Sequence, residues 1–141
     1  MNIKNYDTFF MTIAECAANM SYAKKRKVGC VIVKNNNILS IGWNGQPDGF
    51  DNECEIIDDN GNLKTKDTVI HAEINALCCC LKNGISINGA TAYITLSPCK
   101  NCALALIQSG IKRIIYKEQY LNIEKTGIDL LIKSGINIEQ I

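Results

Sequence analysis

Apolar residues recur along the chain with two different spacings, which predict an alternation of helices and strands. Residues 28–33 form a continuous run of Val, Ile, Cys and Gly that is typical of a buried strand. The asparagines at 35–37 predict a turn, and residues 38–43 a second strand that pairs with the first as a hairpin. Helical spacing of apolar residues over 6–20 is carried by Phe9, Phe10, Ile13, Ala14 and Ala17.

Residues 44–67 contain several Gly residues, a Pro and a pair of Asp residues, and they predict a long irregular loop. Long loops in compact domains are usually functional, so we expect this one to serve the site. A helix is expected over 69–81, with Asp67 or Thr68 as its N-cap.

A third strand is expected over 90–96, followed by a helix that starts with Ser97 as cap and Pro98 in its first turn and ends at 109–110. The last three expected elements are a strand, a helix and a strand, over 111–117, 124–133 and 136–141. This order predicts an α/β fold with three αβα layers, in which helices cover both faces of a mixed five-stranded sheet.

The composition fits one domain over residues 1–141, because 47% of the residues are hydrophobic and can form a single core. The net charge of +1 gives no reason to expect a stable nucleic-acid partner. No stretch of about 20 apolar residues is present, so no membrane span is expected. Residues 1–7 lack the apolar run of a secretion signal, which places the protein in the cytoplasm.

Eight cysteines could indicate a disulfide framework, but the length and the absence of an export signal favour reduced thiols. Cys16 and Cys30 lie in apolar segments and are expected to be buried. Consecutive cysteines at 78–80 point about 100° apart on a helix, so they cannot share one metal ion. We expect core or subunit-contact residues there, with a second metal site as the alternative.

Two short motifs carry the chemistry of the chain: His71-Ala72-Glu73 and Pro98-Cys99-Lys100-Asn101-Cys102. They supply three metal ligands, which we expect to be His71, Cys99 and Cys102, and a carboxylate that is not needed as a ligand. A structural zinc site uses four protein ligands, whereas three ligands leave a position open for water in a hydrolytic site. His71 is the only histidine of the chain, so the zinc site depends on it.

Both motifs fall at predicted helix starts, where the helix dipole stabilises thiolates. In the mechanism expected from these residues, zinc lowers the pKa of water to about 7 and Glu73 transfers the proton to a ring nitrogen and the leaving amine. A Cys-x-x-Cys pair alone could also be a redox pair or half of a structural zinc site. The combined H-x-E and P-C-x-x-C pattern is the signature of zinc deaminases and favours the hydrolytic site.

With these motifs, the chain resembles the cytidine deaminase superfamily, and more narrowly the deoxycytidylate (dCMP) deaminases. The resemblance covers nearly the whole chain. The metal motif is typical of the superfamily as a whole, whereas the segment 42–49 (Gly-Trp-Asn-Gly-Gln-Pro-Asp-Gly) and the sequence His71-Ala72-Glu73-Ile74-Asn75-Ala76 are typical of the subgroup. This resemblance implies zinc-dependent conversion of dCMP to dUMP and ammonia, which supplies dUMP for thymidylate synthesis.

The resemblance also implies contacts to the substrate. Asn44 matches a position that holds the sugar, and the backbone at Ala72 matches one that contacts the pyrimidine. Tyr120 matches an aromatic residue near the substrate, and Ser97 is also expected to contact the substrate.

Members of the subgroup are commonly hexamers that dCTP activates and dTTP inhibits, with Mg²⁺ on the triphosphate. The basic run 24–27 is either a solvated connection or a phosphate-binding segment. The regulatory residues implied by the resemblance and by this run are Arg26, Lys27, Trp43, Asn44 and Gly45. We expect one zinc ion per subunit, because no second histidine exists and Cys54 has no obvious partners nearby.

Two alternatives stay open. The first is a deaminase of the same fold that acts on another nucleoside, a nucleobase or tRNA; the low net charge argues against tRNA. The second is a catalytically silent zinc-binding subunit, against which the presence of Glu73 argues, because a structural site does not need that carboxylate.

Overall fold

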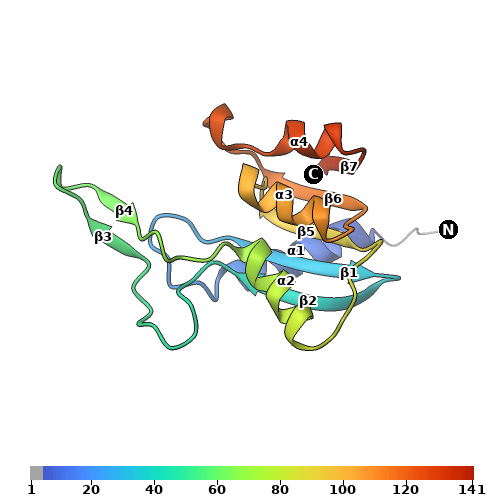
Figure 1. The fold of residues 1–141 in the computed structure, drawn as a ribbon, viewed down its shortest axis with the longest axis horizontal. Helices are drawn as coiled ribbons and strands as arrows, with labels where there is room; N and C mark the ends of the chain where they lie inside the picture. Colours follow the sequence, from blue (N-terminus) through green and yellow to red (C-terminus); the bar gives the residue numbers. More distant parts are fainter. Residues whose placement is uncertain (1–4) are drawn as a thin grey trace.

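A computed structural model describes residues 5–141 and shows one mixed five-stranded sheet (Figure 1). The strands of this sheet are β1 (Gly29–Lys34), β2 (Asn37–Trp43), β5 (Thr91–Leu96), β6 (Arg113–Glu118) and β7 (Asn137–Gln140). Their order is β2-β1-β5-β6-β7, with β1 antiparallel to both neighbours and the last three strands parallel. The predicted mixed sheet is confirmed. Residues 1–4, part of the segment searched for a secretion signal, lie outside the described structure.

Helices cover both faces of the sheet, which confirms the three-layer prediction. One face is covered by α1 (Tyr6–Ala18), which packs against β1 and β5. The other face carries α2 (Ala72–Lys82), α3 (Lys100–Gln108) and α4 (Ile128–Lys133), preceded by a 3₁₀ helix, η1 (Ile123–Lys125) (Figure 1). Within residues 5–141, no helix has the length and apolar character needed to cross a membrane.

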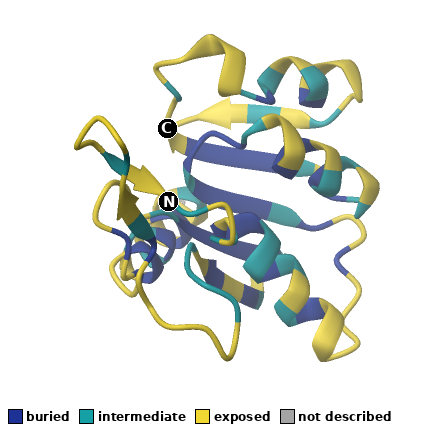
Figure 2. Ribbon diagram, turned by 60° about the vertical axis from the view of Figure 1, so that its left-hand side comes forward, coloured by how far each residue is buried: buried dark blue, intermediate teal, exposed yellow. Residues whose placement is uncertain are grey.

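Alternation of side chains along β1 divides the core between the two faces. Val31 and Val33 pack with Phe10 of α1, whereas Cys30 and Ile32 point to the opposite face. The central strands are therefore buried on both sides (Figure 2). On the second face, the helices contribute Ala72, Ala76, Cys80, Ala103, Leu106 and Leu131.

The predicted hairpin is confirmed, and its turn consists of two residues, Asn35 and Asn36. Lys34 pairs with Asn37, and the two turn residues have φ angles of 50° and 60°. Asparagine tolerates this left-handed conformation better than most residues, which explains why an Asn-rich turn can connect β1 to β2 without glycine.

The expectation of an irregular segment over 44–67 is wrong in part. The segment contains a second, two-stranded sheet made of β3 (Glu55–Ile57) and β4 (Leu63–Thr65), which pair antiparallel. We call residues 51–66 the arm; they extend from the body of the fold and are mostly exposed (Figures 1 and 2). Strands of three residues with one exposed face leave little alternation of apolar residues in the sequence.

The start of α2 also differs from the prediction. The expected helix over 69–81 begins three residues later, because Ile70 is extended and pairs with Gly45 through two backbone hydrogen bonds. His71 is therefore the N-cap of α2, in place of residues 67–68.

The predicted helix over 124–133 is divided into η1 and α4. Between them Thr126 pairs with Cys99, and the N–H of Gly127 donates to the carbonyl oxygen of Pro98 at 2.8 Å. These contacts interrupt helical hydrogen bonding and hold the segment against the start of α3. The prediction that Cys16 is buried is wrong, because it lies on the exposed side of α1.

Glycine allows α2 to lie directly on β2. A Cβ atom at Gly42 would be 2.4 Å from the carbonyl oxygen of Ala72 and 2.5 Å from the amide nitrogen of Ala76. On the same face, the hydroxyl of Ser40 donates to the carbonyl oxygen of Ala76 at 2.7 Å. The first turn of α2 is thus fixed against the sheet. Gly29 permits an equally close approach of α1, with a Cβ atom only 1.9 Å from a helix carbonyl oxygen.

We expect Gly42→Ala to lower the free energy of unfolding by about 1–3 kcal/mol, because the methyl group would overlap helix backbone. Urea unfolding measures this change. Gly45→Ala is the matched control and should change stability by less than about 0.5 kcal/mol, because no atom lies within 4 Å of its Cβ position. Equal stability of the two variants would contradict the close packing described.

An ion pair joins α1 to the sheet. It lies at the end of the strands that is opposite to the starts of α2 and α3. The guanidinium of Arg113 donates two 2.8 Å hydrogen bonds to Asp7, and the hydroxyl of Tyr93 donates to the same carboxylate at 2.7 Å. Arg113 also contacts Glu139 of β7 at 3.3 Å. The hydrogen bonds from Arg113 hold the pKa of Asp7 below its ordinary value, with Tyr93 adding to the effect.

A carboxylate with a lowered folded-state pKa stabilises the fold above its unfolded pKa, and this stability is lost as pH falls through the folded value. We therefore expect Asp7→Asn to lower the free energy of unfolding by on the order of 2 kcal/mol at neutral pH. The difference from the parent protein should shrink below about pH 4, measured by urea unfolding at several pH values. Asp59→Asn, at an exposed position in the β3–β4 turn, is the control. Parallel pH profiles for the parent and Asp7→Asn proteins would rule out this contribution.

Candidate active site

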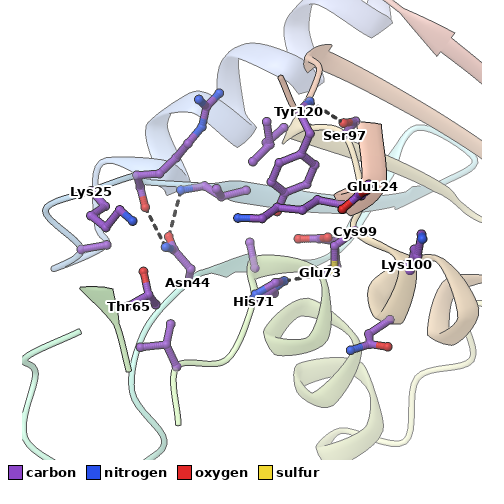
Figure 3. A pocket seen from close by; sticks show the side chains of 18 residues that line it. Lys25, Asn44, Thr65, His71, Glu73, Ser97, Cys99, Lys100, Tyr120 and Glu124 are labelled. Atoms are coloured by element: carbon purple, nitrogen blue, oxygen red, sulfur yellow. Dashed lines mark hydrogen bonds between the residues drawn. The ribbon is translucent and has the colours of Figure 1, made fainter. Parts of the chain in front are cut away.

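A pocket of about 610 Å³ opens where β2, β5 and β6 end and β1 begins. Its walls come from segments far apart in the sequence: the loop before β1, the start of α2, the β5–α3 connection and the chain after β6 (Figure 3). Ligands of open α/β sheets bind at this position, outside the carboxyl ends of strands. Of the residues expected in the site, the pocket is lined by Arg26, Asn44, His71, Ala72, Glu73, Ser97, Cys99 and Tyr120.

The three expected metal ligands come together at this pocket. His71 Nδ1 lies 3.5 Å from Cys99 Sγ and 3.4 Å from Cys102 Sγ. Tetrahedral zinc with bonds of about 2.0 Å to nitrogen and about 2.3 Å to sulfur separates a nitrogen and a sulfur ligand by about 3.5 Å. Donor chemistry and spacing therefore fit zinc. In residues 5–141, this is the only group of three or more His, Cys, Asp or Glu residues that could hold a metal ion.

Cys99 lies at the N-terminus of α3 and is its N-cap; its sulfur accepts the N–H of Cys102 at 3.5 Å. A hydrogen bond from the Cys102 thiol, followed by those from His71 and this amide, lowers the pKa of Cys99 to about 4. The contact with Cys99 raises the pKa of Cys102. The pair therefore carries one thiolate at neutral pH, which prepares it for a cation. The prediction of Ser97 as helix cap is wrong, since α3 begins at Lys100.

Glu73 points into the pocket from the first turn of α2, and its side chain is buried. Burial raises the pKa of this carboxyl group, with the thiol of Cys102 and His71 acting in the opposite direction. Figure 3 shows the carboxylate next to Cys99. His71 and Glu73 are two residues apart, and both line the pocket at the start of α2. A buried carboxyl group whose pKa is raised is suited to accepting and releasing a proton.

Asn44 uses both ends of its amide to hold the chain before β1. Its oxygen accepts the N–H of Val28, and its nitrogen donates to the carbonyl oxygen of Arg26, both at 2.8 Å (Figure 3). The hydroxyl of Ser21 donates to the backbone oxygen of Asn44 at 2.7 Å. One N–H of the amide and one lone pair of its oxygen remain for a ligand. The expected sugar contact of Asn44 stays a prediction.

Ser97 joins the ends of β5 and β6. Its N–H donates to the backbone oxygen of Glu118 at 2.7 Å, and its buried hydroxyl accepts the N–H of Tyr120 at 3.1 Å. Tyr120 lies over the pocket, where burial raises the pKa of its phenol, with Glu73 as the next contribution. Ala72 is fully buried and begins α2. The substrate contacts expected of these residues are not tested by the geometry.

The residues expected to be regulatory lie in two segments, 26–27 and 43–45, which the amide of Asn44 joins through its hydrogen bond to the carbonyl oxygen of Arg26. Arg26 lies between the pocket and a second hollow of about 510 Å³, where it pairs with Glu118 at 2.5 Å; Lys27 lines only the hollow. Gly45 pairs with Ile70, as described above. The backbone oxygen of Trp43 accepts a hydrogen bond from Asn75 of α2 at 2.7 Å.

Several residues that line the pocket were not predicted as site residues, among them Lys25, Thr65, Lys100 and Lys125. Lys100 could have been identified from its position inside the P-C-x-x-C motif. Lys25 lies in the basic run, which was recognised only as a whole. Thr65 and Lys125 have no local signal, because they reach the pocket through the arm and through the segment held against α3.

The cysteines at 54 and 78–80 differ in burial and do not form a metal site in the described residues. Cys80 is buried in the core, whereas Cys78 is exposed and Cys79 is intermediate. Cys54 is buried at the base of the arm. The core role predicted for residues 78–80 is thus confirmed for Cys80 alone.

Comparison with known proteins agrees with this geometry. Residues 4–118 match the family described as the cytidine and deoxycytidylate deaminase zinc-binding region. Deoxycytidylate deaminase of Enterobacteria phage T4 is 34% identical over 165 residues, covering 91% of this chain and 86% of that protein. Deoxycytidylate deaminase of Mus musculus is 36% identical over 124 residues, covering 84% of this chain and 68% of that protein.

The fold is shared with a solved structure as well. The crystal structure of dCMP deaminase from cyanophage S-TIM5, in complex with dCMP and dUMP, has a TM-score of 0.89 to this chain. The two chains are 38% identical, and the match covers 99% of this chain and 100% of the cyanophage chain. The resemblance inferred from the sequence is confirmed: this chain belongs to the cytidine and deoxycytidylate deaminase family.

Proposed function

We propose that this protein hydrolyses dCMP to dUMP and ammonia and so supplies dUMP for thymidylate synthesis. The observation that carries this proposal is the buried Glu73 carboxyl beside a His71, Cys99 and Cys102 group with zinc-ligand spacing. The similarity to deoxycytidylate deaminases over most of the chain supports dCMP as the substrate.

His71, Cys99 and Cys102 would hold zinc, which supplies a Lewis acid that lowers the pKa of water at the site. Glu73 takes a proton from the water that adds to C4 of the cytosine ring, and delivers a proton to N3. It then takes the proton of the C4 hydroxyl group and passes it to the amino group, so that the C4–N bond breaks and ammonia leaves while C4 becomes a carbonyl. Asn44, the backbone at Ala72, Ser97 and Tyr120 bind and orient the substrate.

The regulatory proposal follows the resemblance. dCTP as activator and dTTP as inhibitor, with Mg²⁺ on the triphosphate, would contact Arg26, Lys27, Trp43, Asn44 and Gly45. The protein would be a homo-oligomer, specifically a hexamer, with one zinc ion per subunit. It would act in the cytoplasm, without a membrane or a stable nucleic-acid partner. The second hollow beside Arg26 and Lys27 supports the part of this proposal that concerns phosphate binding.

Replacement of two residues separates zinc binding from catalysis. We expect Glu73→Gln to keep zinc and to lower kcat about 100- to 10,000-fold, because proton transfer is lost. His71→Ala should lose both zinc and activity, because one of three ligands is removed. Metal analysis should find one zinc ion per chain in the parent protein.

Cys78→Ser serves as the control for metal content, because Cys78 is exposed and outside the ligand group. Full activity of the Glu73→Gln protein with zinc bound would refute the role assigned to this carboxyl group. Two tightly bound zinc ions per parent chain would refute the single site.

Ammonia release from dCMP, CMP, deoxycytidine, cytosine and tRNA, each with and without dCTP and dTTP, tests substrate and regulation together. We expect dCMP to be the preferred substrate, with higher activity in dCTP and lower activity in dTTP. Preference for cytosine or tRNA would favour another deaminase of this fold. A zinc-loaded protein without activity on any of them would favour the silent subunit. An unchanged response of Lys27→Ala to both triphosphates would remove Lys27 from the regulatory site.

A further inference from the structure

The loop before β1 brings a row of cations to one end of the pocket. Residues 24–27 are Lys, Lys, Arg and Lys, all exposed, and Lys25 and Arg26 line the pocket beside Asn44 and Thr65 (Figure 3). No carboxylate lines the pocket from this loop or from the strand ends next to it, whereas on the opposite wall Glu124 accompanies the lysines. This end of the pocket is therefore the more favourable place for an anionic group.

The conformation of this loop depends on contacts made by side chains elsewhere in the chain. Asn44 fixes its C-terminal part through Arg26 and Val28, as described above. The N-terminal part is fixed by Glu55, the first residue of β3. One carboxylate oxygen, Oε1, accepts the N–H of Lys24 at 2.8 Å and that of Lys25 at 3.1 Å.

Glu55 binds the backbone of the loop and not its charged side chains. Among residues 5–141, it takes part in no salt bridge, although it is adjacent to four cations. Hydrogen bonds from two consecutive amides to one carboxylate oxygen fix the peptide planes of the loop, and so the direction in which Lys25 and Arg26 leave the backbone. Because Glu55 belongs to the arm, it also connects the arm to the pocket.

The side chain of Arg26 is available for exchange at the rim of the pocket. Its partner Glu118 and the guanidinium are 62% and 47% exposed, so their ion pair contributes little free energy. A phosphate dianion offers the guanidinium a more strongly charged, bidentate partner than this carboxylate.

We propose that Glu55 is a positioning residue for phosphate recognition: it holds the loop so that Lys25 and Arg26 meet the 5′-phosphate of the substrate. The arm then determines preference for a nucleotide over a nucleoside. This inference rests on the proposed function, because dCMP differs from deoxycytidine only in that phosphate.

Positioning and simple electrostatics predict opposite signs for the same substitution. Removal of the Glu55 charge would make the loop more positive and, by electrostatics alone, would strengthen phosphate binding. Loss of the two backbone hydrogen bonds should instead weaken it. We expect Glu55→Ala to raise KM for dCMP on the order of tenfold with kcat unchanged. Glu55→Gln, whose amide oxygen can still accept both hydrogen bonds, should restore most of the affinity.

Ligands without the phosphate provide the comparison. Inhibition constants of dUMP and deoxyuridine are measured against dCMP turnover in the same variants. Glu55→Ala should weaken dUMP by a factor similar to its effect on KM, and should change deoxyuridine less than about twofold. Glu53→Ala is the matched control, because it removes the same charge two residues before Glu55. The side chain of Glu53 forms no hydrogen bond or ion pair in the described structure.

Three results would overturn the inference. In the first, Glu55→Ala leaves KM unchanged or lowers it; in the second, it weakens dUMP and deoxyuridine equally. In the third, Lys125→Ala, on the opposite wall, raises KM for dCMP while Lys25→Ala and Arg26→Ala do not. In each case a parent enzyme that deaminates dCMP leaves the proposed function intact. A parent enzyme inactive on dCMP would refute the proposed function and this inference with it.

Discussion

The approach of two helix N-termini at one edge of the sheet is the constraint on which the active site depends. His71 and Cys99 are 28 residues apart in the sequence, yet their ligand atoms are 3.5 Å apart. On one side, Gly42 lets α2 lie directly on β2, and the pairing of Gly45 with Ile70 fixes where the helix begins. On the other side, α3 follows β5 after a short connection, two strands away in the same sheet.

The same edge also explains how the pocket is closed. Ser97 connects the ends of β5 and β6 through hydrogen bonds at 2.7 and 3.1 Å, which places Tyr120 over the buried Glu73. The segment after Tyr120 returns to the start of α3 and pairs with it at Cys99. Most of the pocket wall is thus fixed to a strand end or a helix start.

Local signals were sufficient to predict the sheet, its hairpin and the group of three residues that could hold a metal ion. The hairpin follows from β-branched residues on both sides of an asparagine turn, and the group of three residues follows from the H-x-E motif and from two cysteines one helical turn apart. The first residues of α2, α3 and α4 could not be predicted in this way, whereas α1 begins at Tyr6 as expected. Ser97 and Pro98 are favourable at a helix start, but the backbone hydrogen bond from Ser97 to Glu118 continues the pairing of β5 with β6, and Cys99 is the cap. The strands of the arm were not predicted because three residues are too few to show a periodic pattern. The contact of Glu55 with residues 24–25 was not predicted because the partners are 30 or more positions apart in the sequence.

The caps of α2 and α3 have a consequence for assembly of the molecule. Helix N-caps are usually small polar side chains that satisfy free backbone amides, but here His71 and Cys99 occupy both positions, and His71 makes no side-chain hydrogen bond to its helix. In the proposed zinc site, the residues that begin two separate helices would be ligands of one ion. A zinc ion held by both would act as a common clamp on the two helix starts, so that metal capture also completes the folding of this edge of the sheet.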